Sequence, residues 1–143
     1  MRRQQQVAVP EGTLMSHPNE ELVRKGYEAF STGDVASMRQ LLDPQVVWHA
    51  GGRNPLSGDY RGVEDVLAFF GRTMEHTQGS FQVSVEEVLV NDQGAAVVQR
   101  SSGQRNGKSF DDRGVQLFRI SDGRAVEVWQ YFGDPYAVDE VMA

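Results

Sequence analysis

Apolar residues in the first half of the chain recur at the three- and four-residue spacing of helices. The first such stripe contains Leu22, Val23, Gly26, Tyr27 and Phe30. Asn19 can cap the start of this helix, and Gly33 can close it in the left-handed conformation. A second stripe contains Val35, Met38, Leu41 and Leu42, between a capping Asp34 and a helix-breaking Pro44. A third stripe, after residue 62, contains Val63, Val66, Leu67, Phe70 and Met74. The pattern therefore predicts three helices.

Alternation with a period of two dominates the rest of the chain and predicts strands. A first strand is expected at 46–49, before a glycine-rich loop at 50–62. Later strands are predicted over 81–90, 95–102, 109–120 and 124–132. The alternation changes parity at Glu86-Glu87, which predicts a bulge there. Asn106-Gly107 has the composition of a tight hairpin turn, and residues 136–142 are expected to form a short helix.

The last two predicted strands place glutamines among apolar side chains. Gln116 and Phe118 share one face of the first strand, and Val128, Gln130 and Phe132 share one face of the second. A buried amide requires a hydrogen-bond partner. This face therefore forms either a polar network or a ligand pocket.

Helices followed by an antiparallel meander give an α+β fold. A strongly bent mixed or antiparallel sheet around three N-terminal helices forms a cone-shaped barrel, whose interior can hold a small ligand. Residues 15–143 are predicted to form one domain. Residues 1–14 show no sustained period, and they are predicted to be a flexible N-terminal extension.

Composition narrows the classes of function. The formal charge is −6 at neutral pH, which argues against nucleic acid or an anionic membrane as partner. The chain has no cysteine, and its three histidines lack the spacing of metal ligands, so no metal is expected. No phosphate-binding glycine loop occurs, and no organic cofactor is expected either. The apolar runs are shorter than a membrane span, and the first residues lack the apolar centre of a secretory signal. A cytoplasmic location is the expectation.

Four segments resemble the nuclear transport factor 2-like superfamily, and within it the SnoaL-like proteins. They are Tyr-Glu-Ala-Phe-Ser-Thr-Gly-Asp at 27–34, Leu-Leu-Asp-Pro-Gln-Val-Val-Trp-His at 41–49, Asp-Tyr-Arg-Gly at 59–62 and Trp-Gln-Tyr-Phe-Gly-Asp at 129–134. The resemblance covers roughly residues 19–142 and implies the same cone. It does not define a reaction, because the superfamily includes isomerases, hydrolases, cyclases and non-catalytic binders.

The resemblance implies four candidate catalytic residues. The slot of the ketosteroid isomerase general base holds His49, and that of the oxyanion-hole aspartate holds Gln116. The oxyanion-hole tyrosine of ketosteroid isomerases lies in the first helix, and Tyr27 is within one residue of the matching position. The catalytic aspartate slot of limonene-epoxide hydrolases holds Gln130, which cannot act as a base. This difference, with the missing Arg-x-Asp pair, argues against epoxide hydrolysis.

Each candidate also has a structural interpretation. Val47 and His49 share a strand face, which the resemblance places inside the cone. There His49 is either a general base with a pKa near neutrality or a core histidine bonded to a glutamine. Gln116 and Gln130 either donate to an oxyanion or bond each other across the strands. Tyr27 either contacts the ligand or packs with its hydroxyl at the surface.

Further side chains are expected to line the cavity and contact the substrate. They are Val47, Phe70, Phe118, Val128, Phe132 and Arg100. Arg100 depends on a hairpin offset that the sequence leaves open, and the alternative is a solvated arginine. Trp48, Trp129 and Tyr131 fall on the opposite strand faces. There they are either buried under helices or form a homodimer interface. The resemblance favours a homodimer, because members of this superfamily commonly dimerise through the outer face of the sheet.

Two functions follow from these expectations. The first is a SnoaL-like enzyme, isomerase- or cyclase-like, that transfers a proton on a small hydrophobic, carbonyl-bearing substrate. His49 would be the base or acid, with Gln116 and Gln130 polarising the carbonyl and Tyr27 assisting. The alternative is a non-catalytic module that binds a hydrophobic ligand or only dimerises. The residues do not identify the substrate.

Overall fold

The computed structural model describes residues 16–143, so the predicted extension over 1–14 lies outside the described residues. The elements follow in the order α1 (Pro18–Thr32), α2 (Val35–Leu41), β1 (Leu42–Ala50), β2 (Gly58–Arg61), α3 (Val63–His76), β3 (Gln82–Asn91), β4 (Gly94–Arg105), β5 (Lys108–Ser121), β6 (Arg124–Tyr131) and α4 (Pro135–Met142). The predicted α+β fold with three N-terminal helices is confirmed, and α4 is the short C-terminal helix.

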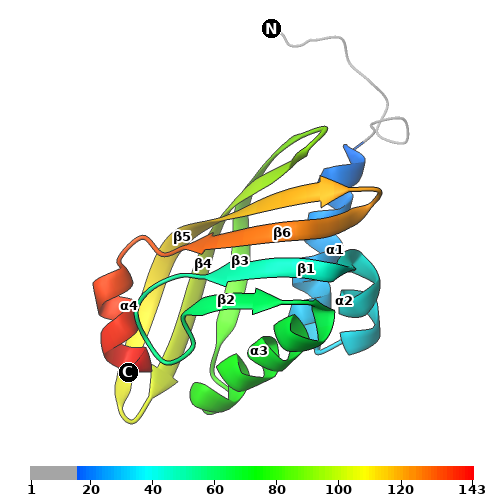
Figure 1. Ribbon diagram of the computed structural model, residues 1–143. Coiled ribbons are helices and arrows are strands. Elements are labelled where there is room, and N and C mark those ends of the chain that lie inside the picture. The colour runs from blue at the N-terminus through cyan, green and yellow to red at the C-terminus, as the bar shows by residue number, and fades with distance from the viewer. Residues whose placement is uncertain (1–15) are drawn as a thin grey trace, which may run out of the picture.

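The six described strands form one mixed sheet in the order β2-β1-β6-β5-β4-β3. β1 and β6 are parallel, and every other pair is antiparallel. The predicted bulge is confirmed by a register shift between Val85 and Glu87, and another shift lies between Arg119 and Ile120. Bulges bend strands and increase their twist. The sheet consequently curves around α1, α2 and α3, while α4 packs against β4 and β5 (Figure 1).

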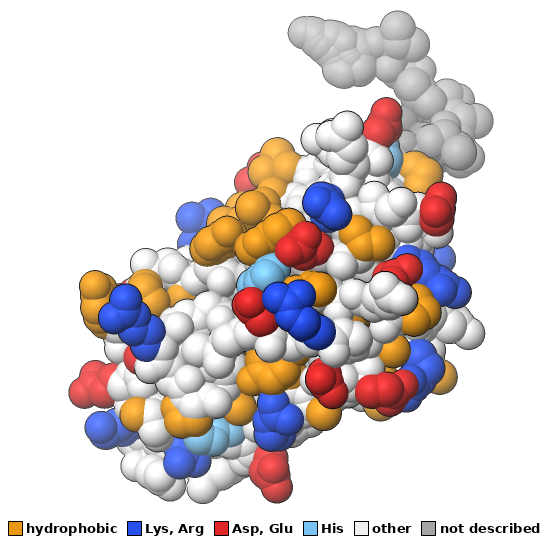
Figure 2. Space-filling model, in the orientation of Figure 1, with side chains coloured by type: hydrophobic (Ala, Val, Ile, Leu, Met, Phe, Trp, Pro, Cys, Tyr) orange, Lys and Arg blue, Asp and Glu red, His pale blue; other side chains and the backbone are white. Residues whose placement is uncertain are grey.

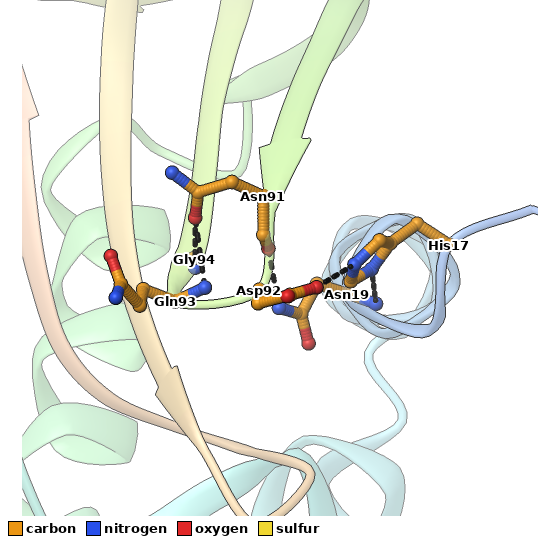
Figure 3. Close-up of polar contacts among 6 residues, drawn as sticks. All are labelled: His17, Asn19, Asn91, Asp92, Gln93 and Gly94. Carbon is orange, nitrogen blue, oxygen red and sulfur yellow. Dashed lines mark hydrogen bonds and ion pairs between the residues drawn. The ribbon is translucent and has the colours of Figure 1, made fainter.

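Both ends of α1 are held by specific contacts. Its N-cap is His17 rather than the predicted Asn19, because the His17 Nδ1 atom accepts a hydrogen bond from the Asn19 backbone N–H at 3.0 Å. The other ring nitrogen of His17 lies 3.0 Å from a carboxylate oxygen of Asp92, and the Asn19 side chain donates to the Asn91 carbonyl. These contacts fasten α1 to the turn between β3 and β4 (Figure 3). At the other end, Gly33 has the predicted left-handed conformation, with φ of 71°.

The glycine-rich segment at 50–62 contains a strand that the sequence pattern did not predict. β2 pairs antiparallel with β1 and places Tyr60 on Phe69, with ring centroids 4.4 Å apart. The preceding loop is fixed by Asp139 of α4, whose carboxylate accepts from the backbone N–H of Arg53 and from the side chain of Asn54. This segment is therefore anchored to both the sheet and α4.

The main core lies between the helices and the concave face of the sheet. Val46, Val66 and Val128 are fully buried there. Around them pack Trp48 and Phe69, with exposures of 7% and 5%. Within residues 16–143, no helix combines the length and apolar character needed to cross a membrane.

Candidate functional site

A cavity of about 100 Å³ lies between α1, α2, α3 and the concave face of the sheet. Its wall is mainly apolar and rich in aromatic residues, among them Phe30, Trp48, Phe70, Phe81 and Phe118. The volume is below the roughly 300–1,000 Å³ of sites for drug-sized ligands. It is closer to the ~150 Å³ apolar cavity that binds benzene in an engineered protein. A molecule of about one ring therefore matches the space.

Three polar side chains at this cavity form a hydrogen-bonded relay, which we call the amide relay: Gln99, Tyr27 and Gln116. The Tyr27 hydroxyl donates to Gln99 Oε1 and accepts from Gln116 Nε2, both at 2.5 Å. Burial raises the pKa of Tyr27 far above its usual value, and the hydrogen bond from Gln116 opposes this only in part. Tyr27 therefore remains a neutral hydroxyl. The expectation that its hydroxyl reaches the surface is wrong, because the hydroxyl bridges two inner strands.

Two further polar side chains line the cavity: Gln130, and Thr73, whose hydroxyl donates to the Phe69 carbonyl. Gln130 lies directly opposite Gln116 in the ladder between β5 and β6. The two glutamines do not bond each other, because Gln130 Oε1 accepts from the Gly51 backbone N–H at 3.1 Å. A Cβ atom at position 51 would lie 2.5 Å from the Gln130 carbonyl oxygen, so this close approach requires glycine. Gln116 and Gln130 thus face the same hollow with separate partners.

The predicted placement of His49 and Val47 inside the cone is wrong. Val46 and Trp48 are the buried residues of this part of β1, and neither Val47 nor His49 lines the cavity. Trp48, expected on the outer face, instead forms part of the cavity wall. Its indole Nε1 is the one buried side-chain polar atom within residues 16–143 that has no hydrogen-bond partner. The strand contains the predicted residues 46–49, but its inner and outer faces are exchanged relative to the prediction.

His49 belongs to a separate cluster on the convex face of the sheet. Its ring nitrogens lie 2.7 Å from Asp59 of β2 and 2.7 Å from Glu127 of β6. Its ring stacks on Trp129, with centroids 5.4 Å apart. The hydrogen bond to Glu127 raises the pKa of His49, burial acts against it, and Asp59 adds to the rise. Two carboxylates at opposite ring nitrogens favour the doubly protonated imidazolium.

The structure also corrects the placement of Arg100 and identifies a missed residue. Arg100 points outward and pairs with Asp111 at 3.3 Å and Glu86 at 3.6 Å. The inner position belongs to its neighbour Gln99, which is only 4% exposed. The segment Val97-Val98-Gln99-Arg100 offers apolar residues in both parities, so alternation alone does not select its inner face. The only sign in the sequence that Gln99 could belong to the site was its position as a polar residue next to two valines.

The remaining lining residues are distributed around the hollow. Phe70 and Phe118 form part of its wall. Val128 shares a face of β6 with Gln130 and is fully buried in the core. Phe132 lines a second cavity of about 30 Å³. Gln130 lies in the walls of both cavities. The structure therefore brings together Tyr27, Gln116 and Gln130 from the predicted set, and separates them from His49.

The wall of the larger cavity is uncharged at neutral pH. Among the described residues that line the larger cavity, Tyr27 is the only ionisable one. The site therefore presents hydrogen-bond donors and acceptors to a ligand, while its walls contain neither a carboxylate nor an imidazole to abstract a proton. Within residues 16–143, no group of three or more potential metal-ligating side chains comes together.

Comparison with known proteins places these features in a family. The family model described as the SnoaL-like domain matches residues 23–128. An uncharacterised protein of Mycobacterium tuberculosis is 34% identical over 124 residues, covering 86% of this chain and 95% of that protein. The solved structure of Bal32a, from a soil-derived mobile gene cassette, has a TM-score of 0.85 and 35% identity, covering 88% of this chain and 97% of its own.

A more distant similarity concerns the fold alone. The solved structure of IdmH from Streptomyces antibioticus, a proposed polyketide cyclase, has a TM-score of 0.71 at 20% identity. The match covers 89% of this chain and all of that chain.

Proposed function

This chain belongs to the SnoaL-like family, and we propose that its cavity binds a small, uncharged, mainly apolar molecule of about one ring. The observation that carries this proposal is the presence of the amide relay within an aromatic hollow of about 100 Å³. Aromatic walls supply affinity through apolar burial, while a few fixed polar groups orient the ligand. Neutral polar groups suit a neutral ligand, because an unpaired charge is costly to bury.

A second candidate function is an enzyme that polarises a carbonyl group, of the cyclase or isomerase type. Two observations favour it: side-chain amides that can donate to an oxyanion, and the similarity of fold to IdmH. Proton abstraction by His49 is not part of this candidate, because His49 lies on the convex face. Without a base in the wall, such an enzyme would need a substrate that carries its own acidic or basic group.

The binding proposal is tested by titrating the protein with toluene while following backbone amide signals by NMR. Shifts are expected on α1, α3 and the concave face of β4–β6. Gly26 lines the cavity, and a Cβ atom there meets nothing within 4 Å, so Gly26→Leu should fill the hollow. Gly71→Leu is the matched control, because Gly71 is an exposed glycine of α3 with the same open surroundings.

The expected result is that Gly26→Leu abolishes the toluene shifts while Gly71→Leu retains them. Shifts that persist in Gly26→Leu, or shifts confined to the convex face, would contradict binding in this cavity. Turnover of a carbonyl substrate that survives Gln116→Leu and Gln130→Leu would remove the second candidate.

The predicted homodimer also remains a proposal, with the convex face of β5 and β6 as its interface. Leu117 and Tyr131 are 38% and 52% exposed there; Leu117 pairs directly with Trp129 in the ladder, and Tyr131 lies two residues further along β6. Figure 2 shows hydrophobic side chains gathered over these strands, beside a histidine. Apolar and aromatic residues grouped in this way are typical of interface centres.

Light scattering after size-exclusion chromatography tests this interface. The wild-type protein is expected at twice the monomer mass, and Leu117→Lys combined with Tyr131→Lys at the monomer mass. Tyr136→Lys is the control, since Tyr136 is 86% exposed but lies on α4. A wild-type monomer would refute the interface.

A further inference from the structure

We propose that the polar end of the cavity selects a ring that bears a hydroxyl group over a hydrocarbon, an ether or a carboxylate of the same size. This inference rests on the proposed binding function of the cavity. It follows from the number of protons in the amide relay and from the fixed orientation of Gln130.

The Tyr27 hydroxyl carries one proton, so it can donate to only one of its two amide neighbours. It donates to Gln99 Oε1, and it therefore accepts from Gln116 Nε2. This direction leaves Gln116 Oε1 and Gln99 Nε2 without a hydrogen-bond partner among residues 16–143. Reversing the relay would rotate both amides, but it would again leave one oxygen and one nitrogen. The relay always offers a ligand one acceptor and one donor.

These two remaining atoms are open to the cavity. Gln99 and Gln116 are 4% and 5% exposed, and both side chains belong to the cavity wall. In the described part of the chain, the only fully enclosed side-chain polar atom without a partner is Trp48 Nε1. The unused amide atoms of Gln99 and Gln116 therefore keep contact with the hollow, where a ligand can reach them.

Gln130 adds a donor whose direction is fixed. A backbone N–H can only donate, so the hydrogen bond from Gly51 identifies the accepting atom as Gln130 Oε1. The Gln130 Nε2 group consequently remains as a donor without a partner among residues 16–143, on a side chain that lines this cavity as well as the smaller one. Because Gln116 and Gln130 are directly opposite in the β5–β6 ladder, their side chains start from neighbouring points on one face.

A hydroxyl group matches this pair of glutamines. Its oxygen can accept from Gln130 Nε2, and its proton can be donated to Gln116 Oε1. An ether or ketone can accept but cannot donate, so it leaves an amide oxygen unpaired, and a hydrocarbon leaves both groups unpaired. A carboxylate adds the cost of burying a charge, with no cationic side chain in the cavity wall. Phenol is therefore the preferred probe, ahead of anisole, toluene and benzoate.

The test measures Kd for phenol, toluene, anisole and benzoate by isothermal titration or NMR. The ratio of the toluene Kd to the phenol Kd cancels most of the apolar contribution. This ratio should fall about fivefold in Gln116→Met, which keeps a side chain of similar length but loses the acceptor. Gln130→Met should lower it by a similar factor. Arg100→Met is the matched control and should leave it unchanged, because Arg100 faces outward.

Toluene binding separates failure of this inference from failure of the proposed function. If no probe binds the wild-type protein, the binding function fails and this inference fails with it. If toluene binds but the ratio is the same in wild type, Gln116→Met and Gln130→Met, only the hydroxyl selection is overturned. If the variants do not fold, the wild-type side-chain amide signals decide: phenol should shift those of Gln116 and Gln130 more than anisole does. Equal shifts, or benzoate binding as tightly as phenol, would contradict the inference.

Discussion

The two faces of the sheet stabilise their polar groups by different means. On the concave face, Tyr27 bridges two glutamines in a neutral relay at an aromatic cavity. On the convex face, His49 bridges Asp59 and Glu127 in a cluster that depends on charge. In each cluster one aromatic side chain lies between two polar partners: Tyr27 between two glutamines, and His49 between two carboxylates. The clusters differ in charge, because His49 can gain or lose a proton near neutral pH whereas the neutral relay cannot.

This difference shows where pH sensitivity is expected in the molecule. The pKa of Tyr27 is raised by burial, so the amide relay keeps the same protons throughout the physiological range. The pKa of His49 is raised by its carboxylate neighbours, so its charge changes above the ordinary histidine value. The cavity should therefore bind ligand similarly at mildly acidic and neutral pH, while the convex face titrates.

The largest effect is expected from removing the centre of the amide relay. Tyr27→Phe leaves Gln99 and Gln116 without their shared partner, and it should lower the free energy of unfolding by about 1–3 kcal/mol. Urea denaturation at pH 5.5 and pH 8.5 should give the same loss. Tyr136→Phe is the control, because this side chain is 86% exposed. A loss that varies strongly with pH would mean that the relay is not neutral.

A smaller effect is expected from Gly26→Ala. Glycine within a helix costs about 0.5–1 kcal/mol relative to alanine, and the new Cβ atom would extend into open space. The substitution should raise the free energy of unfolding by that amount and reduce the cavity. Gly71→Ala, away from the cavity, should give the same gain without changing toluene affinity. If only Gly71→Ala stabilises the protein, the space beside Gly26 is smaller than described.

The smallest effect is expected at His49, because the cluster is partly solvent-exposed and such ion pairs contribute below about 1 kcal/mol. The folded-state pKa lies above the ordinary 6.5. The stabilisation is therefore complete below about pH 6.5 and is lost as the pH rises through the higher folded-state pKa. NMR titration should give a His49 pKa above 6.5, and His49→Gln should remove this part of the pH dependence. A pKa below 6.5 would refute the described contacts.

The concave face of β5 and β6 was predictable because charged residues mark the opposite face of β5. Arg113 and Arg119 are exposed and have the other parity from Gln116 and Phe118, and the tight turn fixes how the two strands face each other. The face on which Gln116 lies therefore follows from the sequence. Its hydrogen-bond partner Tyr27 could not be predicted in this way, because Tyr27 is 89 residues away and belongs to a helix.

The prediction was wrong where a strand is apolar on both sides. In Val46-Val47-Trp48-His49, either parity gives a hydrophobic face, and the choice followed the resemblance to an enzyme slot. Packing against α3 settles the choice, because Trp48 is within aromatic contact of Phe69 and Phe70. Gln99 was missed because it follows two adjacent valines, so that alternation does not show which face of β4 is the inner one. β2 was missed because four residues within a glycine-rich segment carry almost no periodic signal.

The span of the relay along the chain has a consequence for how the protein acquires its native state. Tyr27 is carried by the first helix, while its partners are 72 and 89 residues further on. During synthesis, neither bond can form until β4 and then β5 have been made. Contacts between such distant residues carry a large loop-closure cost and are expected late in folding. Seating of α1 over the cavity should thus be among the last steps, and the hollow would remain open to water until then.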